Sequence, residues 1–538
     1  MSAINDTPDK KKAQDGQAPH EVASSMTAIM DSEYRQLFSA LDADNSGFIQ
    51  YAKLVQVLAQ HGIRLNDPRI NRSFAKAVET GDYLHQQLDY EGFKQIIKES
   101  VGSLIADAIQ GKMIIPDFRD FKQTIQDIYD RVSKSTGGKV ATYIPQLGRV
   151  NPEQFAVSVC TISGQRISIG DSSQYFCIQS ISKPVNYCIA LELHGEDKVH
   201  RHVGREPSGI SFNSLSLNNK GLPHNPLINA GAIMTCSLVN PEMEMADRFD
   251  NVLDTWERLC GGETAKFNNA VYLSERQTAD RNFALGYFMR ENKAFPENTD
   301  LINTLEFYFQ CCSIEVTTDA LSVAAATLAN GGICPITNEQ IFRPDTVKNC
   351  LSLMYSCGLY DFSGEFAFTI GLPAKSGVAG GLMIVVPNLL GIAVWSPRLD
   401  ELGNSVRGIE FCKELVQRFN FHNYDSLLTT AQTKKDPRLK KNETKIEGVM
   451  SMCFAASNND LSEVKQLVAR GVDVNDSDYD GRTALHLAAS EGHLQVVYYL
   501  VRKGANPDAR DRWGNCPIDD ALRGNHKEIA EYLKTLSE

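Results

Sequence analysis

The sequence predicts a multidomain chain, with an α+β domain in the middle, an all-α helical domain before it and helical repeats behind it. Three observations support this prediction. The chain has 538 residues, which is too many for one hydrophobic core, because cores stop growing near about 300 residues. Strand-like segments lie at both ends of the middle region, and a repeat with a 33-residue period occupies the last part.

Composition excludes several classes of protein. A formal net charge of −12 argues against a general nucleic-acid binder, which needs a basic face. No stretch approaches the ~18 uninterrupted apolar residues of a membrane span. The 13 cysteines form no CxxC pair, which is typical of reduced, buried thiols in an intracellular protein. Residues 1–25 are polar and aperiodic, and we expect them to be disordered; they contain aspartates and no arginine, unlike a transit peptide.

Residues 26–103 are predicted to form a helical domain that resembles an EF-hand. The segment Asp42–Ile49 has oxygen ligands at loop positions one, three and five and glycine at position six. Position twelve, where calcium needs a bidentate glutamate, is Lys53, and Gly92 stands at the acidic position of the second half. We therefore expect a calcium-free helix pair that serves packing or assembly.

Residues 104–424 are predicted to be a single α+β domain. Near its start, Phe155–Ile162 alternates like a strand and Arg166–Ile169 returns after a turn; near its end, Leu382–Val386 and Leu390–Trp395 form a second hairpin. The region between the hairpins has mainly helical periodicity. Strands at both ends predict one antiparallel sheet, closed by the first and last segments, with a helical subdomain inserted.

Two further regions follow. Residues 425–445 are rich in lysine and predict a solvated basic linker. In residues 446–538, Gly471 recurs as Gly504 and Ala488 as Ala521. The segment Thr483–Ala488 matches the ankyrin signature, so this region is predicted to be ankyrin repeats, and such repeats commonly bind proteins.

The candidate for catalysis is Ser180, with Lys183 three residues later. A helix predicted to start near Ser180 places both side chains on one face. A desolvated lysine loses its proton more readily and can act as base, and the helix N-terminus favours an oxyanion. S-x-x-K alone is a weak signal, since Ser73 and Ser462 also begin one. Ser180 differs because it follows the strand pair directly and opens a helix.

The segment Lys375–Gly377 resembles the K-T-G element that accompanies S-x-x-K in serine β-lactamases, although the S-D-N element is absent. Several further segments resemble those of serine-dependent glutaminases, in family order over nearly all of residues 105–424. They are Thr142–Leu147, Gln179–Pro184, Pro223–Pro226, Asn229–Ala232, Ser274–Arg276, Asp280–Asn282, Cys357–Asp361 and Ala374–Gly381. With the flanking domains, the layout resembles that of kidney-type glutaminases, which implies a serine β-lactamase-like catalytic fold.

The resemblance implies that L-glutamine is hydrolysed through a glutamyl ester on Ser180. Lys183 would take the serine proton, Tyr360 would relay protons to the leaving ammonia, and the backbone amides of Ser180 and Val378 would form the oxyanion hole. The residues implied to hold glutamine are Tyr143, Gln179, Ser180, Asn229, Glu275, Asn282, Tyr308, Tyr360 and Val378. No cofactor and no metal are implied.

Each of these residues also has an ordinary structural interpretation. The tyrosines could be core aromatics, the asparagines could be cap or turn residues, and Glu275 could pair with Arg276 or Arg281 on the surface. His200 and His202 could suggest a metal site, but they lack a third ligand at usable spacing, so we expect both to be surface residues.

The resemblance also implies a homotetramer or filament, phosphate as an activator, and the mitochondrion, although residues 1–25 leave the cytosol open. Kidney-type members carry a lysine and a phenylalanine where this chain has Ser214 and Ser216. Losing an aromatic anchor weakens an apolar pocket between subunits, so we expect inhibitors of that interface to bind poorly. Two alternatives remain: another S-x-x-K serine hydrolase, and an ankyrin scaffold with an inactive catalytic domain.

Overall fold

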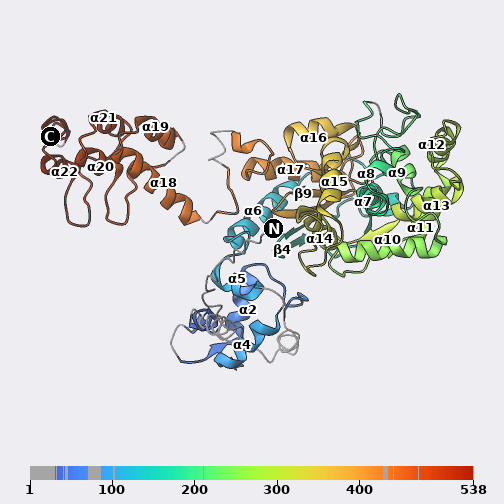
Figure 1. The fold of residues 1–538 in the computed structure, drawn as a ribbon, viewed down its shortest axis with the longest axis horizontal. Helices are drawn as coiled ribbons and strands as arrows, with labels where there is room; N and C mark the ends of the chain where they lie inside the picture. The colour runs from blue at the N-terminus through green and yellow to red at the C-terminus, as the bar shows by residue number, and fades with distance from the viewer. Residues whose placement is uncertain are drawn as a thin grey trace, which may run out of the picture. The chain divides into compact units, whose positions relative to one another are not determined.

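The computed structural model describes residues 31, 33–39, 41–42, 46–70, 86–100, 103–209, 211–427, 434–439, 441–469 and 472–536 (Figure 1). The expectation that residues 1–25 are disordered lies outside these residues. The chain divides into two compact units. The first contains Met1–Gln60 and Arg64–Lys112, and the second contains His61–Ile63 and Met113–Glu538.

The first unit contains the EF-hand-like helices. Its described elements are β1 Ile49–Gln50, α2 Tyr51–Gln60, β2 Gln87–Leu88, α4 Tyr90–Glu99 and α5 Leu104–Gln110. Strands β1 and β2 pair in antiparallel fashion, with Ile49 opposite Leu88. Leu54, Leu58 and Phe93 are fully buried between the helices. The prediction of EF-hand-like helices in this region is therefore confirmed.

Polar groups at the ends of the EF-hand-like loop form hydrogen bonds within the chain. The carboxylate of Asp42 accepts hydrogen bonds from the backbone amides of Ser46 and Gly47, at 3.0 and 2.9 Å. The ammonium of Lys53, at position twelve, donates to the carbonyl of Leu41 at 2.5 Å. In the second half of the EF-hand-like unit, the side chain of Asp89 caps the N-terminus of α4 by accepting a hydrogen bond from the amide of Gly92. These contacts tie the loop to its own helices.

A five-stranded antiparallel sheet forms the centre of the second unit. Its strands are β3 Ala156–Thr161, β4 Arg166–Gly170, β8 Ala374–Ser376, β9 Gly381–Val386 and β10 Leu390–Trp395, in the order β4-β3-β10-β9-β8. The first and last strand segments pair directly, with Val159 opposite Ile392. The predicted sheet, closed by the two ends of the domain, is confirmed.

Helices cover both faces of this sheet. Val157, Val159 and Ile392 point into a core shared with α6 Phe118–Val132 and α17 Val406–Arg418. The residues between these in the strands, such as Ala393 of β10, belong to the core on the other face of the sheet, against α14 Thr318–Ala329 (Figure 1). All of β10 is buried, as expected for a central strand covered on both faces.

The inserted helical subdomain lies between the hairpins, as predicted. Its helices are α7 Ser182–His194, α8 Glu196–Val199, α9 Asn229–Cys236, α10 Met245–Leu259, α11 Asn269–Gln277, α12 Asp280–Glu291 and α13 Leu301–Cys312, followed after α14 by α15 Pro344–Cys357 and α16 Ser363–Thr369. A second sheet, with the order β5-β7-β6, was not predicted. Its strands are β5 Phe176–Cys177, β6 Lys266–Phe267 and β7 Ile314–Val316. Segments of two or three residues are too short to show a period of two.

The C-terminal region consists of paired ankyrin helices. They are α18 Lys441–Ser457, α19 Leu461–Ala469, α20 Ala484–Ser490, α21 Leu494–Arg502, α22 Pro517–Arg523 and α23 Lys527–Lys534. His493 contacts the carbonyl of Ser457 at 2.8 Å, and its repeat equivalent His526 contacts that of Ser490 at 3.0 Å. Equivalent residues thus make equivalent contacts with the preceding repeat, which confirms the predicted repeat.

Part of the basic segment predicted as a solvated linker is attached to the catalytic domain. Lys435 pairs with Asp120 of α6 at 2.9 Å, and its backbone amide donates to the carbonyl of Arg418 at 2.8 Å. Asp120 is far from Lys435 in the sequence, so spacing alone does not reveal this contact.

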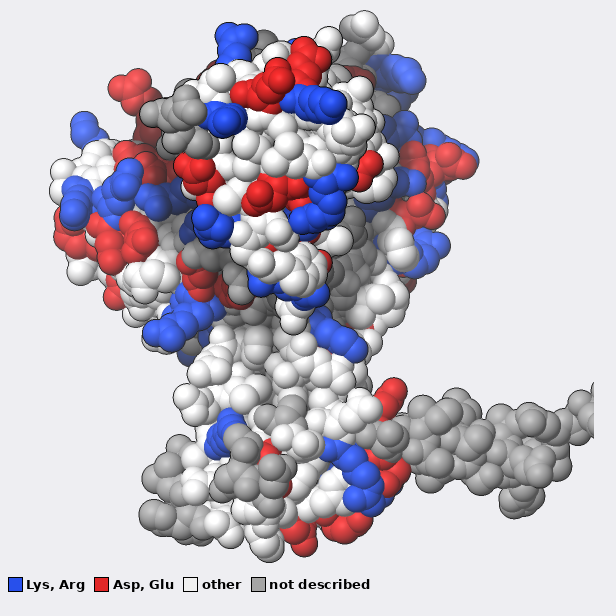
Figure 2. All heavy atoms as spheres, turned by 90° about the vertical axis from the view of Figure 1, so that its left-hand side faces the viewer, with Lys and Arg blue, Asp and Glu red and all other residues white. Residues whose placement is uncertain are grey.

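Surface charge is mixed. On the face drawn in Figure 2, the described Lys and Arg side chains alternate with Asp and Glu side chains and form no extended basic patch. None of the described helices combines the length and the hydropathy that crossing a membrane requires.

Candidate active site

Ser180 lies in a sharp turn between a strand and a helix. The turn is the 3₁₀ segment η3 Gln179–Ile181, which joins β5 to α7. Gln179 has a φ of 49°, in the left-handed region that non-glycine residues rarely adopt. Such a backbone costs free energy and is concentrated at functional sites. The α-helix begins at Ser182, two residues after the predicted start, so Ser180 sits just before its first turn.

Ser180 and Lys183 form the pair predicted from the sequence. The Nζ atom of Lys183 lies 2.5 Å from the Oγ atom of Ser180. Both residues are buried: Lys183 is 2% exposed and Ser180 is 8% exposed. Burial lowers the pKa of Lys183, although the nearby Glu275 carboxylate opposes this effect. A lysine whose neutral form is favoured can accept the serine proton.

Tyr360 is held near Ser180. Its hydroxyl donates to the carbonyl of Ser376 at 3.1 Å, and the nearby Ser180 side chain acts to lower its pKa against the larger effect of burial. Its φ of 54° is left-handed, and Ser363 fixes this turn by donating to the carbonyl of Tyr360 at 2.7 Å. Burial raises the pKa of Tyr360, so the phenol keeps its proton and can donate it.

Lys375 belongs to this site, although the sequence analysis named it only within the K-T-G-like element and gave it no role. It is fully buried, and its Nζ atom donates to the carbonyls of Gly358 and Ser376 at 3.0 and 2.8 Å. It also lies 4.5 Å from the ring centre of Tyr360. Burial, and then the charge of Lys183, hold the pKa of Lys375 well below its ordinary value. The K-T-G-like spacing pointed to this lysine, but its contact with Tyr360 depends on the tertiary fold.

A glycine lets the end of β8 approach the nucleophile turn. A Cβ atom on Gly377 would stand 2.5 Å from the carbonyl oxygen of Ile178, which is closer than real Cβ contacts allow. Gly377 also closes the turn into β9 through its amide, which donates to the carbonyl of Gly381 at 2.9 Å. The close approach brings Val378 and Ser180 to the wall of one pocket.

A small pocket of about 50 Å³ lies over Ser180. Most of the predicted substrate-binding residues line it, namely Tyr143, Gln179, Ser180, Asn229, Glu275, Asn282, Tyr308 and Val378. Tyr360 does not line this pocket. The lining also includes Phe212 and Cys312, which the sequence analysis did not select. Neither belongs to a motif with recognisable chemistry.

Glu275 does not pair with a neighbouring arginine. Its side chain is buried and accepts a hydrogen bond from Gln179 at 3.2 Å, while Arg276 pairs with Glu306 instead, at 2.6 Å. Burial raises the pKa of Glu275 to about 7, against the opposing effects of Gln179 and Lys183. A carboxylate buried without a cation is a natural binding site for a substrate ammonium group.

The other polar groups of the pocket are already oriented. The side-chain nitrogen of Asn229 donates to the side-chain oxygen of Asn282 at 3.1 Å. An amide nitrogen has two N–H groups, so Asn229 has a second one to offer a ligand. Tyr308 is buried, and its ring centre is 5.5 Å from the Nζ atom of Lys183. Tyr143 lies at the rim with 58% of its surface exposed. Together these side chains offer hydroxyl and amide groups to a polar ligand.

Cys312 could in principle compete with Ser180 as a nucleophile, because its side chain lines the same pocket. Burial is the main cause that raises the pKa of the Cys312 thiol, and the nearby Glu275 carboxylate adds to it. The reactive form of cysteine is the thiolate, which this environment disfavours. Ser180, with Lys183 in hydrogen-bond contact, is the better nucleophile.

The two histidines considered as metal ligands have protein partners. His200 contacts the hydroxyl of Tyr187 at 2.8 Å and the carbonyl of Val203 at 2.9 Å, and His202 contacts the carbonyl of Ala294 at 3.0 Å. Both side chains are half-buried, so they are less exposed than a surface interpretation implies. Within the described part of the chain, no group of three or more potential metal ligands occurs.

The sheet, the inserted helices and the Ser180–Lys183 pair define a hydrolase of the serine β-lactamase-like class. Family models match the chain in three places: a glutaminase domain over residues 138–424, ankyrin repeats over residues 452–537 and an EF-hand domain over residues 35–116. The chain therefore belongs to the glutaminase family.

Curated relatives and solved structures agree with this family assignment. The mitochondrial liver isoform of glutaminase from Rattus norvegicus is 46% identical over 439 residues, which cover 81% of this chain and 73% of the relative. Glutaminase from Nostoc sp. is 44% identical over 306 residues, covering 57% of this chain and 90% of the relative. A solved structure of Mglu in its native form is 35% identical with a TM-score of 0.52, and covers 57% of this chain and 74% of that one.

Proposed function

We propose that Ser180 and Lys183 carry out the hydrolysis of L-glutamine to L-glutamate and ammonia in this chain, which is a glutamine amidohydrolase. The observation that carries the proposal is the 2.5 Å contact between the lysine amine and the serine hydroxyl in a buried pocket. Membership of the glutaminase family supports the choice of substrate.

In the first step, the neutral amine of Lys183 takes the hydroxyl proton of Ser180 while Oγ attacks the side-chain carboxamide carbon of glutamine. The oxygen of that carboxamide gains negative charge as the carbon becomes tetrahedral. The backbone amides of Ser180 and Val378 would bind this oxygen, and the positive end of α7 adds to the stabilisation. One such donor contributes about 10²–10³ in rate.

In the second step, the carbon–nitrogen bond breaks and a glutamyl ester remains on Ser180. The leaving nitrogen takes the proton held by Lys183, relayed through the hydroxyl of Tyr360, and departs as ammonia. Water then attacks the ester, its proton passes to Lys183, and the proton returns to Ser180 as glutamate leaves. The nearness of Ser180 and Tyr360 supports this relay.

Recognition of glutamine rests on charge. We assign the substrate ammonium group to Glu275 and the substrate carboxylate to the hydroxyl and amide donors of Tyr143, Asn229 and Tyr308. Gln179 and Asn282 hold Glu275 and Asn229 in place.

Assembly and location extend the proposal. The ankyrin repeats offer a surface for a protein partner, and a homotetramer or filament with phosphate as activator follows the family resemblance. Ser214 and Ser216 replace the larger residues at the expected interface, so an inhibitor that fills an apolar pocket there should bind weakly. The rat relative is named as mitochondrial, and we propose the mitochondrion for this chain as well.

The experiment that tests the function compares ammonia release from glutamine by the wild-type chain and by Ser180→Ala. We expect activity in the wild type and its loss in the variant. Activity that survives in Ser180→Ala would remove this serine from the mechanism. A folded but silent wild type would favour the ankyrin scaffold instead.

A further inference from the structure

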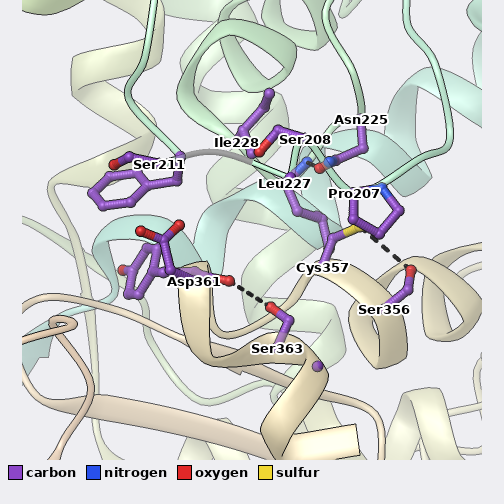
Figure 3. Close-up of a pocket in the computed structure, with 14 residues that line it drawn as sticks. Pro207, Ser208, Ser211, Asn225, Leu227, Ile228, Ser356, Cys357, Asp361 and Ser363 are labelled. Atoms are coloured by element: carbon purple, nitrogen blue, oxygen red, sulfur yellow. Dashed lines mark hydrogen bonds between the residues drawn. The ribbon is translucent and has the colours of Figure 1, made fainter.

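Two cavities lie outside the glutamine pocket but close to the catalytic centre. The larger, of about 450 Å³, lies between the loop around Pro207 and the start of α16 (Figure 3). Its inner polar groups are engaged within the protein: Asn225 donates to a backbone carbonyl at 3.0 Å, and Ser363 donates to the carbonyl of Tyr360 at 2.7 Å. The smaller cavity, of about 230 Å³, differs because it combines an apolar wall with side chains of opposite charge.

We call the smaller one the Trp395 cavity, after the tryptophan that lines it. Its walls come from the segment 146–150, from β5, from β7 and from the turn that follows β8. The indole nitrogen of Trp395 already donates to the carbonyl of Ala379 at 3.0 Å, so this side chain needs no polar ligand. Val378 lines both this cavity and the glutamine pocket, which are therefore neighbouring sites with one wall in common.

Glu315 of β7 brings a carboxylate to the Trp395 cavity. Its Oε1 atom accepts hydrogen bonds from the amide of Asn268 at 2.8 Å and from the thiol of Cys177 at 3.7 Å. Burial, and then the charge of Glu315, raise the pKa of Cys177 well above its ordinary value, so both donors are neutral. Lys266 stands opposite Glu315 in the sheet, but its Nζ atom lies 3.6 Å from the ring centre of Tyr175. No basic side chain in the described part of the chain forms an ion pair with Glu315, so its carboxylate can take an ammonium group from a ligand.

Two further polar groups of the cavity are without protein partners. The Oε1 atom of Gln146 is buried and accepts no hydrogen bond from the described residues. Buried acceptors nearly always have a donor, so this oxygen is suited to a donor from a ligand. The guanidinium of Arg149 is exposed, and no carboxylate among the described residues forms an ion pair with it. A guanidinium binds a carboxylate through two parallel hydrogen bonds, so Arg149 can supply the cation for an acidic group.

We propose that the Trp395 cavity binds a small α-amino acid with an aliphatic side chain. We assign its ammonium group to Glu315 and to Oε1 of Gln146, and its carboxylate to Arg149. The aliphatic side chain packs on the wall that Val150 and Trp395 form. An α-amino acid carries both charges on one small molecule, which matches two unpaired side chains of opposite charge. The volume lies below the ~300–1,000 Å³ of ordinary ligand pockets, so the ligand must be compact.

The test is a calorimetric titration of L-leucine into the full chain carrying Ser180→Ala, with glutamine present at saturation. Glutamine then occupies its own pocket without being turned over, so the heat reports on a second site. We expect one leucine to bind to each chain under these conditions. Glycine has the same two charges and no side chain, and it should bind more weakly by roughly tenfold or more, because it buries no aliphatic group.

Two substitutions in the same background separate the charges. Glu315→Gln should weaken leucine binding by roughly tenfold, the effect of one hydrogen bond to a charged group. Arg149→Gln should weaken it by roughly two- to fivefold, because Arg149 is exposed. The matched controls are Glu365→Gln and Arg119→Gln, at exposed positions outside the cavity lining, and neither should change the affinity.

Two analogues of leucine assign each charge to its partner. Isoamylamine keeps only the ammonium group, so Glu315→Gln should weaken its binding by roughly tenfold and Arg149→Gln should not. Isocaproate keeps only the carboxylate, so Arg149→Gln should weaken its binding by roughly two- to fivefold and Glu315→Gln should not. Arg149 is exposed, so its substitution keeps the test decisive even where Glu315→Gln fails to fold.

Three results would overturn the proposal. The first is that leucine gives no binding heat at any concentration. The second is heat that disappears when glutamine is saturating, which assigns leucine to the glutamine pocket. The third is an unchanged leucine affinity in folded Arg149→Gln and Glu315→Gln, which places the ligand elsewhere on the chain.

Discussion

At the residue scale, Glu275 has the most informative environment in the pocket. Its ordinary pKa of 4.5 rises to about 7 in the folded chain, chiefly because of burial. In the absence of substrate, ionising this carboxyl therefore costs free energy. A bound ammonium group would offset that cost, so the pocket sacrifices stability for recognition of its ligand.

The first prediction concerns stability and pH. A carboxyl whose pKa is raised by folding binds its proton more tightly in the folded state, so its stabilising protonation is lost as the pH rises from 4.5 towards about 7. At about 1.4 kcal/mol for each pKa unit, ionised Glu275 costs roughly 3 kcal/mol. Glu275→Gln should therefore raise the thermal midpoint at about pH 8 but not at about pH 5. The substitution Glu365→Gln, at an exposed position, should change the thermal midpoint at neither pH. Equal midpoints for Glu275→Gln and wild type at the higher pH would contradict the raised pKa of Glu275.

The second prediction concerns binding. In Ser180→Ala, which binds glutamine without turning it over, the dissociation constant should rise about tenfold for each pH unit below about 7, because protonated Glu275 no longer attracts the substrate ammonium group. Isothermal titration calorimetry at several pH values measures this. An affinity that stays constant across that range would show that Glu275 does not hold the ammonium group.

A third prediction tests whether Ser180 or the neighbouring thiol of Cys312 is the nucleophile. Burial keeps Cys312 protonated, so Cys312→Ser should retain kcat within a few-fold, about the effect of a small change in packing. Steady-state ammonia release measures this. A loss as deep as that of Ser180→Ala would assign the nucleophile to the thiol.

At the element scale, the proposed oxyanion hole requires the edge strand β8 and the turn η3 to come close. Gly377→Ala would place a Cβ atom 2.5 Å from the carbonyl oxygen of Ile178 and push the two segments apart. We expect kcat to fall by about 10²-fold, as when one oxyanion donor is displaced. Gly137→Ala, where the added Cβ meets only an ordinary contact at 3.7 Å, should have no effect on ammonia release. Similar kcat values for the two variants would contradict this role of β8.

How much of this arrangement the sequence predicts depends on the length of each element. Long alternating segments such as Ala156–Thr161 have a clear period, and their pairing followed from their position in the chain. The short strands β5, β6 and β7 have no such signal, although they anchor the turn that carries Ser180. Motif spacing located Ser180 and Lys183, whereas Lys375 and Phe212 join the site only through contacts between distant segments.

At the scale of the whole molecule, the ankyrin repeats and the catalytic pocket have separate sources of stability. His486 closes a capping box with Thr483 and contacts the carbonyl of Asn515 in the next repeat at 3.2 Å. His486→Ala should destabilise the repeats by about 1–2 kcal/mol through the loss of these buried contacts.

The same variant should leave glutamine hydrolysis unchanged, because every residue that lines the glutamine pocket lies between Tyr143 and Val378. Thermal unfolding and ammonia release measured on one preparation check both parts. A large loss of kcat in His486→Ala would show that the repeats control the pocket.

The most direct test of the central claim is mass spectrometry of the full chain, quenched in acid during turnover of glutamine. We expect a peptide containing Ser180 that carries a glutamyl ester, and no such peptide from Ser180→Ala. A glutamyl group found on another residue, or turnover that continues in Ser180→Ala, would contradict it.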